Sequence, residues 1–167
     1  IVAVILLAIL LPTILKSLGL HADYKGSKDY NLKGNKALII TTSHGVLNKP
    51  GKTKGAKTGV LGSEMTVPYY EFQDAGMEVD VASIKGGEIP IDPQSFYYMI
   101  KSDSDKRYLK DKDFQAKVKN SLKIDDVDFT KYEAIMLAGG WGAAYDLGQS
   151  EELGKKISEA YYAERQI

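Results

Sequence analysis

Short runs of consecutive apolar residues alternate with longer amphipathic stretches from residue 36 onward. Residues 37–42 and 134–138 are apolar almost without interruption, which is typical of strands buried on both faces of a parallel sheet. Residues 77–82 alternate between apolar and polar positions and are predicted as another strand. Helical spacing with a closing glycine predicts a helix over residues 64–75. This strand, helix, strand order predicts a right-handed parallel unit.

The remaining segments extend this pattern. Residues 96–126 are charged, with apolar positions at helical spacing, and predict one or two solvated helices on the sheet edge. A helix is predicted over residues 150–163, with Ser150 as its N-cap, and residues 165–167 are predicted to approach another strand. The fold class is therefore α/β, with helices on both sides of a parallel sheet that is incomplete at the C-terminus.

Two connections are unusually long. Residues 43–62 form a loop rich in glycine, lysine and proline, and residues 84–95 form a Pro/Gly loop that is expected to cover part of the domain. Pro68 is expected in the first turn of its helix, or at a kink, because proline removes a helical hydrogen bond.

The N-terminal segment has a different composition. Residues 1–15 are uncharged and apolar on every side, so residues 1–20 are predicted to be a membrane anchor and the protein to be a membrane protein. A cleaved signal for export and a buried core helix are the alternatives. Residues 21–35 are polar and predict a linker to a single domain over residues 36–167. Lysines beyond the apolar run favour a cytoplasmic domain.

Composition excludes several classes of function. The 22 basic and 22 acidic side chains cancel, which disfavours nucleic-acid binding. The chain has no cysteine and only two histidines, which excludes a disulfide framework and a structural zinc site. We expect no metal and no cofactor. Residues 51–58 approach a P-loop, but Ala56 replaces an obligatory glycine; residues 140–145 approach a dinucleotide fingerprint, but Tyr145 occupies its third glycine position. We reject both motifs and interpret residues 51–58 as a flexible basic loop.

Gly139 and Gly140 follow a predicted buried strand at its carboxyl end, where open α/β sheets collect ligands. Their backbone N–H groups could stabilise an oxyanion, although an ordinary tight turn would use the same residues. Glu64 is the only acid near the end of the first strand. It could be a buried acid that faces the same crevice, or it could be a surface carboxylate that interacts with the helix dipole.

A series of segments resembles the ThiJ/PfpI superfamily, with its class I glutamine amidotransferase-like fold, in the branch of heat-shock chaperones and glutathione-independent glyoxalases. The resemblance covers residues 36–167 nearly without gaps. It is carried by residues 37–44, 58–59, Glu64, 68–70, 74–76, 81–83, 86–87, 92–93, 122–124, 126–127, 132–135, 138–140 and 146–147.

The resemblance implies a flavodoxin-like sheet and a cysteine nucleophile followed by histidine, both expected beyond Ile167. It implies a catalytic role for Glu64 beside the thiol and for Gly139 and Gly140 at the oxyanion. It also implies that His44 and Trp141 line the substrate pocket, with Trp141 where the family usually has histidine. This fragment alone is expected to be inactive.

These features predict a membrane-tethered protein that acts on small reactive carbonyls as a glyoxalase, deglycase or cysteine hydrolase. A homodimer is possible. The alternative is a non-catalytic chaperone (holdase) or scaffold with the same fold. Glutamine amidotransferase activity would require a partner synthase domain, which nothing in the sequence suggests.

Overall fold

A four-stranded parallel sheet forms the centre of the computed structural model, which describes residues 1–22 and 24–167. Its strands follow the order β5-β4-β1-β6 across the sheet. The most buried strand, β1, lies between β4 and β6, so that Ile39 is paired with Val81 on one side and with Met136 on the other. The strands are β1 (Lys36–Thr41), β4 (Glu78–Ser83), β5 (Leu122–Lys123) and β6 (Ala134–Leu137).

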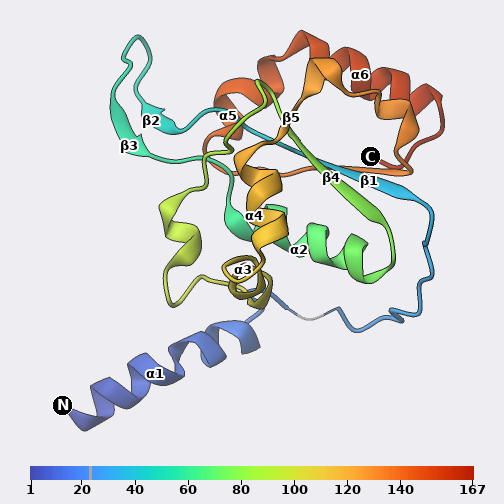
Figure 1. Cartoon of the computed structure of the whole chain (residues 1–167). Coiled ribbons are helices and arrows are strands. Elements are labelled where there is room, and N and C mark those ends of the chain that lie inside the picture. The colour runs from blue at the N-terminus through green and yellow to red at the C-terminus, as the bar shows by residue number, and fades with distance from the viewer. Residues whose placement is uncertain (23) are drawn as a thin grey trace.

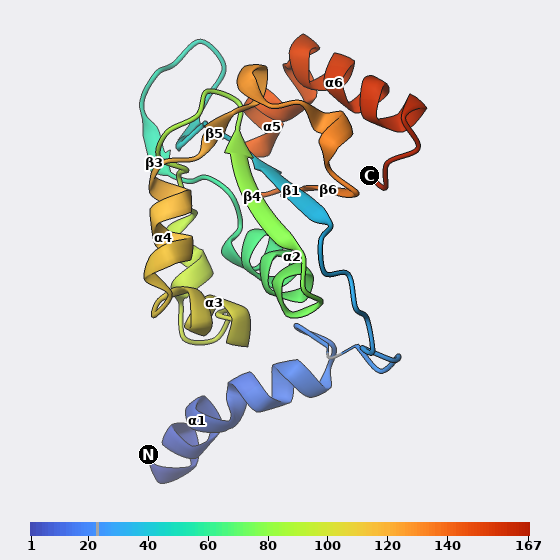
Figure 2. The same cartoon turned by 45° about the vertical axis from the view of Figure 1, so that its right-hand side comes forward.

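Helices cover both faces of this sheet (Figures 1 and 2). Helix α2 packs under the sheet together with α3 and α4, while α6 lies across the opposite face with the short α5 before it. These helices are α2 (Gly62–Asp74), α3 (Asp103–Tyr108), α4 (Lys112–Lys119), α5 (Ala143–Asp146) and α6 (Glu151–Tyr162). The predicted parallel sheet between helices is therefore confirmed.

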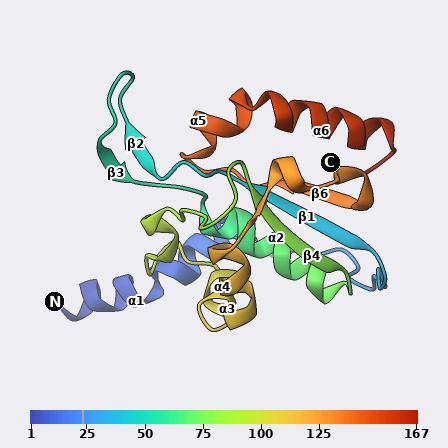
Figure 3. The ribbon, with the colours of Figure 1, turned by 45° about the horizontal axis from the view of Figure 1, so that its top comes forward.

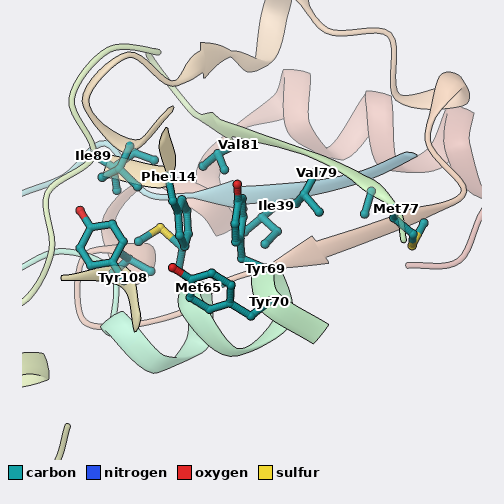
Figure 4. Close-up of a cluster of buried hydrophobic side chains, with 14 residues drawn as sticks. Ile39, Met65, Tyr69, Tyr70, Met77, Val79, Val81, Ile89, Tyr108 and Phe114 are labelled. Atoms are coloured by element: carbon teal, nitrogen blue, oxygen red, sulfur yellow. The ribbon is translucent and has the colours of Figure 1, made fainter. Parts of the chain in front are cut away.

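Aromatic rings fill the space between α2, α4 and the sheet (Figure 4). Phe114 stacks on Tyr69 with ring centroids 3.5 Å apart, and Tyr70 and Tyr108 meet Phe114 edge-on at 5.6 and 5.1 Å. Burial raises the pKa of Tyr69 to about 12, because removal from water disfavours the charged phenolate. This cluster fixes α2 against the underside of the sheet.

Local signals in the sequence placed several element ends correctly. Ser150 is the N-cap of α6, and its hydroxyl accepts a hydrogen bond from the Leu153 N–H at 3.2 Å. Gly76 ends α2 in the left-handed conformation, with φ of 94°. Gln166 forms a parallel bridge with Ala134, in agreement with the predicted approach of residues 165–167 to another strand. Residues 96–126 contain α3 and α4.

Two local predictions are wrong. Pro68 lies in the middle of α2 (Gly62–Asp74), so its expected place in the first turn is wrong, while the alternative of a kink stays a prediction. The predicted loop over residues 43–62 contains an antiparallel hairpin of β2 (Val46–Asn48) and β3 (Gly55–Lys57), which projects away from the sheet (Figure 3). Residues 51–58 are therefore not simply a flexible loop.

The predicted membrane anchor is also wrong. Helix α1 (Val2–Ser17) has 16 residues, which at about 1.5 Å per residue is shorter than the roughly 30 Å of a bilayer core. Within residues 1–22 and 24–167, no helix combines the length and apolar character that crossing a membrane requires. The predicted transmembrane helix and membrane localisation are thus contradicted. The core-helix alternative fails as well, because α1 has no buried residue.

The segment between α1 and β1 has no helix or strand over residues 24–35. It nevertheless touches the domain, since the Leu32 N–H donates to the Ala75 carbonyl at 2.8 Å and the Leu32 side chain packs against the core. Before it, the His21 ring nitrogen Nε2 lies 2.6 Å from the Ile100 carbonyl oxygen. Part of the predicted linker is therefore held against α2.

Candidate active site

Glu64 and Gly139 meet at the carboxyl end of the sheet. Glu64 is the third residue of α2, and its Oε2 accepts a hydrogen bond from the Gly139 N–H at 2.7 Å. The carboxylate is exposed and lies in the first helical turn, where a negative charge interacts favourably with the helix dipole. The expectation of a buried acid is therefore wrong, because Glu64 lies on the surface, although its carboxylate does contact Gly139.

Backbone hydrogen bonds hold the glycine turn against the start of α2. The Leu61 N–H donates to the Gly139 carbonyl at 3.0 Å, and the Gly142 N–H donates to the Gly59 carbonyl at 3.1 Å. Gly140 has φ of 126°, and a Cβ there would lie 2.4 Å from the Leu61 nitrogen. Only glycine fits this position without a shift of the backbone.

The two candidate oxyanion donors differ in their present partners. The Gly139 N–H is already bound by Glu64, whereas within the described residues no acceptor contacts the Gly140 N–H. An open backbone donor next to a carboxylate can bind a developing oxyanion while the carboxylate moves a proton. The Gly140 N–H and the Glu64 carboxylate are the two groups at this edge that fit these roles.

Asp146 fixes the other side of this edge, and the sequence analysis did not identify it. Its Oδ1 accepts from the Thr42 hydroxyl at 2.7 Å and its Oδ2 from the Ser43 N–H at 2.8 Å. The Thr42 hydroxyl oxygen in turn accepts from the His44 N–H at 2.8 Å. Asp146 therefore ties α5 to the exit of β1. Its partners lie about a hundred positions away in sequence, so no local pattern indicates this role.

The structure does not join the two predicted pocket residues to Glu64. The half-buried His44 ring stacks on Tyr145 at 4.1 Å, and its Nε2 faces the Val46 carbonyl and the Asn48 side chain. Trp141 follows Gly140 and is 64% exposed. The His44 ring thus anchors the hairpin, although the His44 carbonyl lies against Gly142, where a Cβ would approach it to 2.4 Å. A pocket role for His44 and Trp141 stays a prediction.

A cavity of about 840 Å³ lies between the 84–95 loop, α3 and α4. Glu64, Gly139 and Gly140 are not among its walls. The segment 59–61 separates them, since the Val60 N–H donates to the Pro90 carbonyl on one side while Leu61 contacts Gly139 on the other. The cavity is lined by Ser43, Gly45, Glu88, Ile89, Pro90, Ile91, Phe96, Tyr108, Leu109, Gln115, Val118 and Lys119. The 84–95 loop thus forms a wall of the cavity, as its length suggested.

A metal centre is not apparent in this region. In the part of the chain that the structure describes, no three histidine, aspartate or glutamate side chains gather closely enough to hold a metal ion. The described groups at this edge of the sheet include the Glu64 and Asp146 carboxylates and backbone N–H donors.

Comparisons with known proteins show the family and the fold of this chain. The DJ-1/PfpI family matches residues 56–167. The glutathione-independent glyoxalase hsp3102 of Schizosaccharomyces pombe is 30% identical over 131 residues, which cover 77% of this chain and 53% of that protein.

Two solved structures share the fold. The Rapid Encystment Protein 24 kDa of Francisella tularensis is 35% identical with a TM-score of 0.68, covering 77% of this chain and 54% of that one. The glyoxalase III of Candida albicans is 26% identical with a TM-score of 0.65, covering 77% and 53%. This chain spans about half the length of these relatives.

Proposed function

Because the chain belongs to the DJ-1/PfpI family, we propose that the whole protein converts small reactive carbonyl compounds such as methylglyoxal, with Glu64, Gly139 and Gly140 in its active site. The observation that carries this proposal is the 2.7 Å hydrogen bond between the Glu64 carboxylate and the Gly139 N–H. The curated relatives are named glyoxalases, which favours an enzyme over the non-catalytic chaperone.

The proposed reaction needs a nucleophile that this chain does not contain, since it has no cysteine. We propose that a cysteine outside these 167 residues supplies it, as the family resemblance implies. Its thiolate would attack the aldehyde carbon, and the carbonyl oxygen would take up a proton to give a hemithioacetal. Proton transfer within the substrate would turn the hemithioacetal into a lactoyl thioester, and water would then cleave its C–S bond to release lactate and the free thiol. Methylglyoxal and water together have the composition of lactate, so the overall conversion requires no oxidant or reductant.

The residues of this chain would supply proton transfer and charge stabilisation. Glu64 would move the proton between the substrate carbon and oxygen, and the open Gly140 N–H would donate to the oxyanion. The Gly139 N–H keeps the carboxylate oriented toward the reacting group. The possible homodimer and the roles of His44 and Trp141 remain predictions.

The test uses the complete protein and measures lactate formed from methylglyoxal without glutathione. Glu64→Gln keeps an oxygen that can accept from Gly139 but removes the charge, so we expect kcat/KM to fall about a hundredfold. Glu159→Gln removes an exposed carboxylate on α6 and is the matched control, with unchanged activity. Unchanged turnover in Glu64→Gln would remove Glu64 from the mechanism. Absence of lactate formation by the wild-type protein would reject the function itself.

A further inference from the structure

The hairpin of β2, β3 and the turn between them, residues 46–57, forms an arm that extends away from the sheet (Figures 1 and 3). We call it the basic arm. All residues from 49 to 57 are exposed. They include the four lysines Lys49, Lys52, Lys54 and Lys57. The arm is thus a dense group of positive charges held in solvent.

No acid of the described structure neutralises this charge. The four lysines take part in none of its ion pairs, although some cations elsewhere do, such as Arg107 with Asp74 and Lys36 with Glu78. Residues 30–63 contain six lysines and no acid, so the rest of this neutral chain has a net charge of −6. Four of these six lysines lie on the basic arm, so much of the local positive charge is concentrated on one projecting element.

The arm is fixed at its base and at its turn. The Tyr145 hydroxyl donates to the Asn48 carbonyl at 2.7 Å, and the Asn48 side-chain amide donates to the Lys52 carbonyl at 2.7 Å. The Thr58 N–H closes the base of the hairpin on the Gly45 carbonyl at 3.0 Å. A surface held in place before binding loses less conformational freedom when a partner docks.

We propose that the basic arm docks an acidic segment of another polypeptide, whose Asp and Glu carboxylates pair with the lysine ammonium groups. Nucleic acid fits this surface less well. Residues 45–58 contain no aromatic side chain for base stacking and no arginine. A long polyanion would also extend over a domain whose remaining charge is negative. A short acidic peptide can contact the arm alone. This inference does not depend on the carbonyl chemistry.

The experiment measures binding of a fluorescein-labelled deca-glutamate peptide to the full chain by fluorescence anisotropy at 50 mM salt. The arm variant combines Lys49→Gln, Lys52→Gln and Lys54→Gln. Its matched control combines Lys110→Gln, Lys112→Gln and Lys155→Gln, which remove the same charge from exposed positions elsewhere. We expect Kd to rise about tenfold in the arm variant and less than about twofold in the control. Binding should also weaken at 300 mM salt.

Several outcomes would overturn the proposal. One is no binding of deca-glutamate to the wild-type chain at 50 mM salt; another is equal weakening in both variants, which would indicate net charge rather than the arm. Tighter binding of a labelled deca-thymidylate would point to nucleic acid instead. Circular dichroism of each variant checks that the fold is intact, which we expect because all the replaced side chains are exposed.

Discussion

The two faces of the sheet are built from different side chains. The face that carries α2, α3 and α4 is packed with four buried aromatic residues, of which Phe114 contacts the other three. The face that carries α6 is mostly aliphatic, with Leu38, Ile40 and Leu153 at its centre. Strand β1 supplies both faces, since Ile39 points to one and its neighbours point to the other.

The two faces hold different helices in place, and only α2 carries a residue of the candidate site. Helix α2 carries Glu64, and its start is bonded to the glycine turn after β6. Interlocking rings restrict the position of α2 more than interchangeable aliphatic groups would, because aromatic pairs have preferred geometries. Helix α6 contributes no residue to the Glu64 pair. We therefore expect changes on the α2 face to cost more and to reach the candidate site.

The largest effect is expected from Phe114→Ala. The side chain is fully buried and stacked on Tyr69, so its removal should lower the free energy of unfolding by about 3 to 5 kcal/mol. Urea denaturation followed by circular dichroism measures this. Leu153→Ala on the α6 face is the comparison and should cost about 2 to 3 kcal/mol. An equal or larger loss in Leu153→Ala would show that the two faces do not differ as described.

Gly140→Ala should be the next most damaging change. Its φ of 126° and the 2.4 Å approach of a Cβ to the Leu61 nitrogen force the backbone to shift, at a cost of about 1 to 3 kcal/mol. Gly154→Ala in α6 is the matched control, because a Cβ there meets no atom within 4 Å. That replacement should stabilise the protein by about 0.5 to 1 kcal/mol. A change in the free energy of unfolding with the same sign in both variants would contradict the assignment of backbone strain to Gly140.

Alkaline pH should weaken the α2 face through Tyr69. Its pKa is raised to about 12 in the folded protein, above about 10 in the unfolded chain. The contribution of the neutral Tyr69 side chain to folding stability is therefore fully present below pH 10. It is lost as the pH rises through 12, which lowers the free energy of unfolding by about 2 kcal/mol. Denaturation midpoints measured from pH 8 to 12 should fall less steeply in Tyr69→Phe than in the wild type. Identical slopes would show that Tyr69 is not the group responsible.

The smallest effect concerns the cap of α6. Ser150→Ala removes the hydroxyl that accepts from the Leu153 N–H and should cost about 1 kcal/mol. Ser158→Ala in the same helix removes only a bond to the Gly154 carbonyl and should have almost no effect on the thermal midpoint. Lactate formation by the complete protein should be unchanged in both, because α6 is remote from Glu64. A loss of activity in Ser150→Ala would contradict this and would show that the α6 face affects the candidate site.

The sequence predicted those features whose physical cause lies within a few residues. The unbroken apolar run before Thr42 indicated a buried strand, and Ser150 indicated the start of a helix. The hairpin was missed because glycine, proline and lysine have low strand propensity, and its stability comes from bonds to residues such as Tyr145. The role of Asp146 was missed because its partners, Thr42 and Ser43, lie about a hundred positions away in the sequence.

The candidate site was predictable only in part. Placing Glu64 and Gly139 at one edge followed from the parallel order of the strands, since carboxyl ends of parallel strands meet at the same edge. The Glu64 carboxylate accepts from the Gly139 N–H and leaves the Gly140 N–H open. This arrangement depends on the left-handed turn at Gly140 and on its contact with Leu61. No sequence pattern encodes such a contact.

The central position of β1 has a consequence for how the protein is made. Its partner β6 follows about a hundred residues later, with Ile40 paired to Leu137. At roughly 5 to 20 residues per second, the ribosome adds β6 about 5 to 20 seconds after β1. During that interval one edge of the strand that ends up most buried has no native neighbour, so this is a period when the nascent chain is exposed to mispairing.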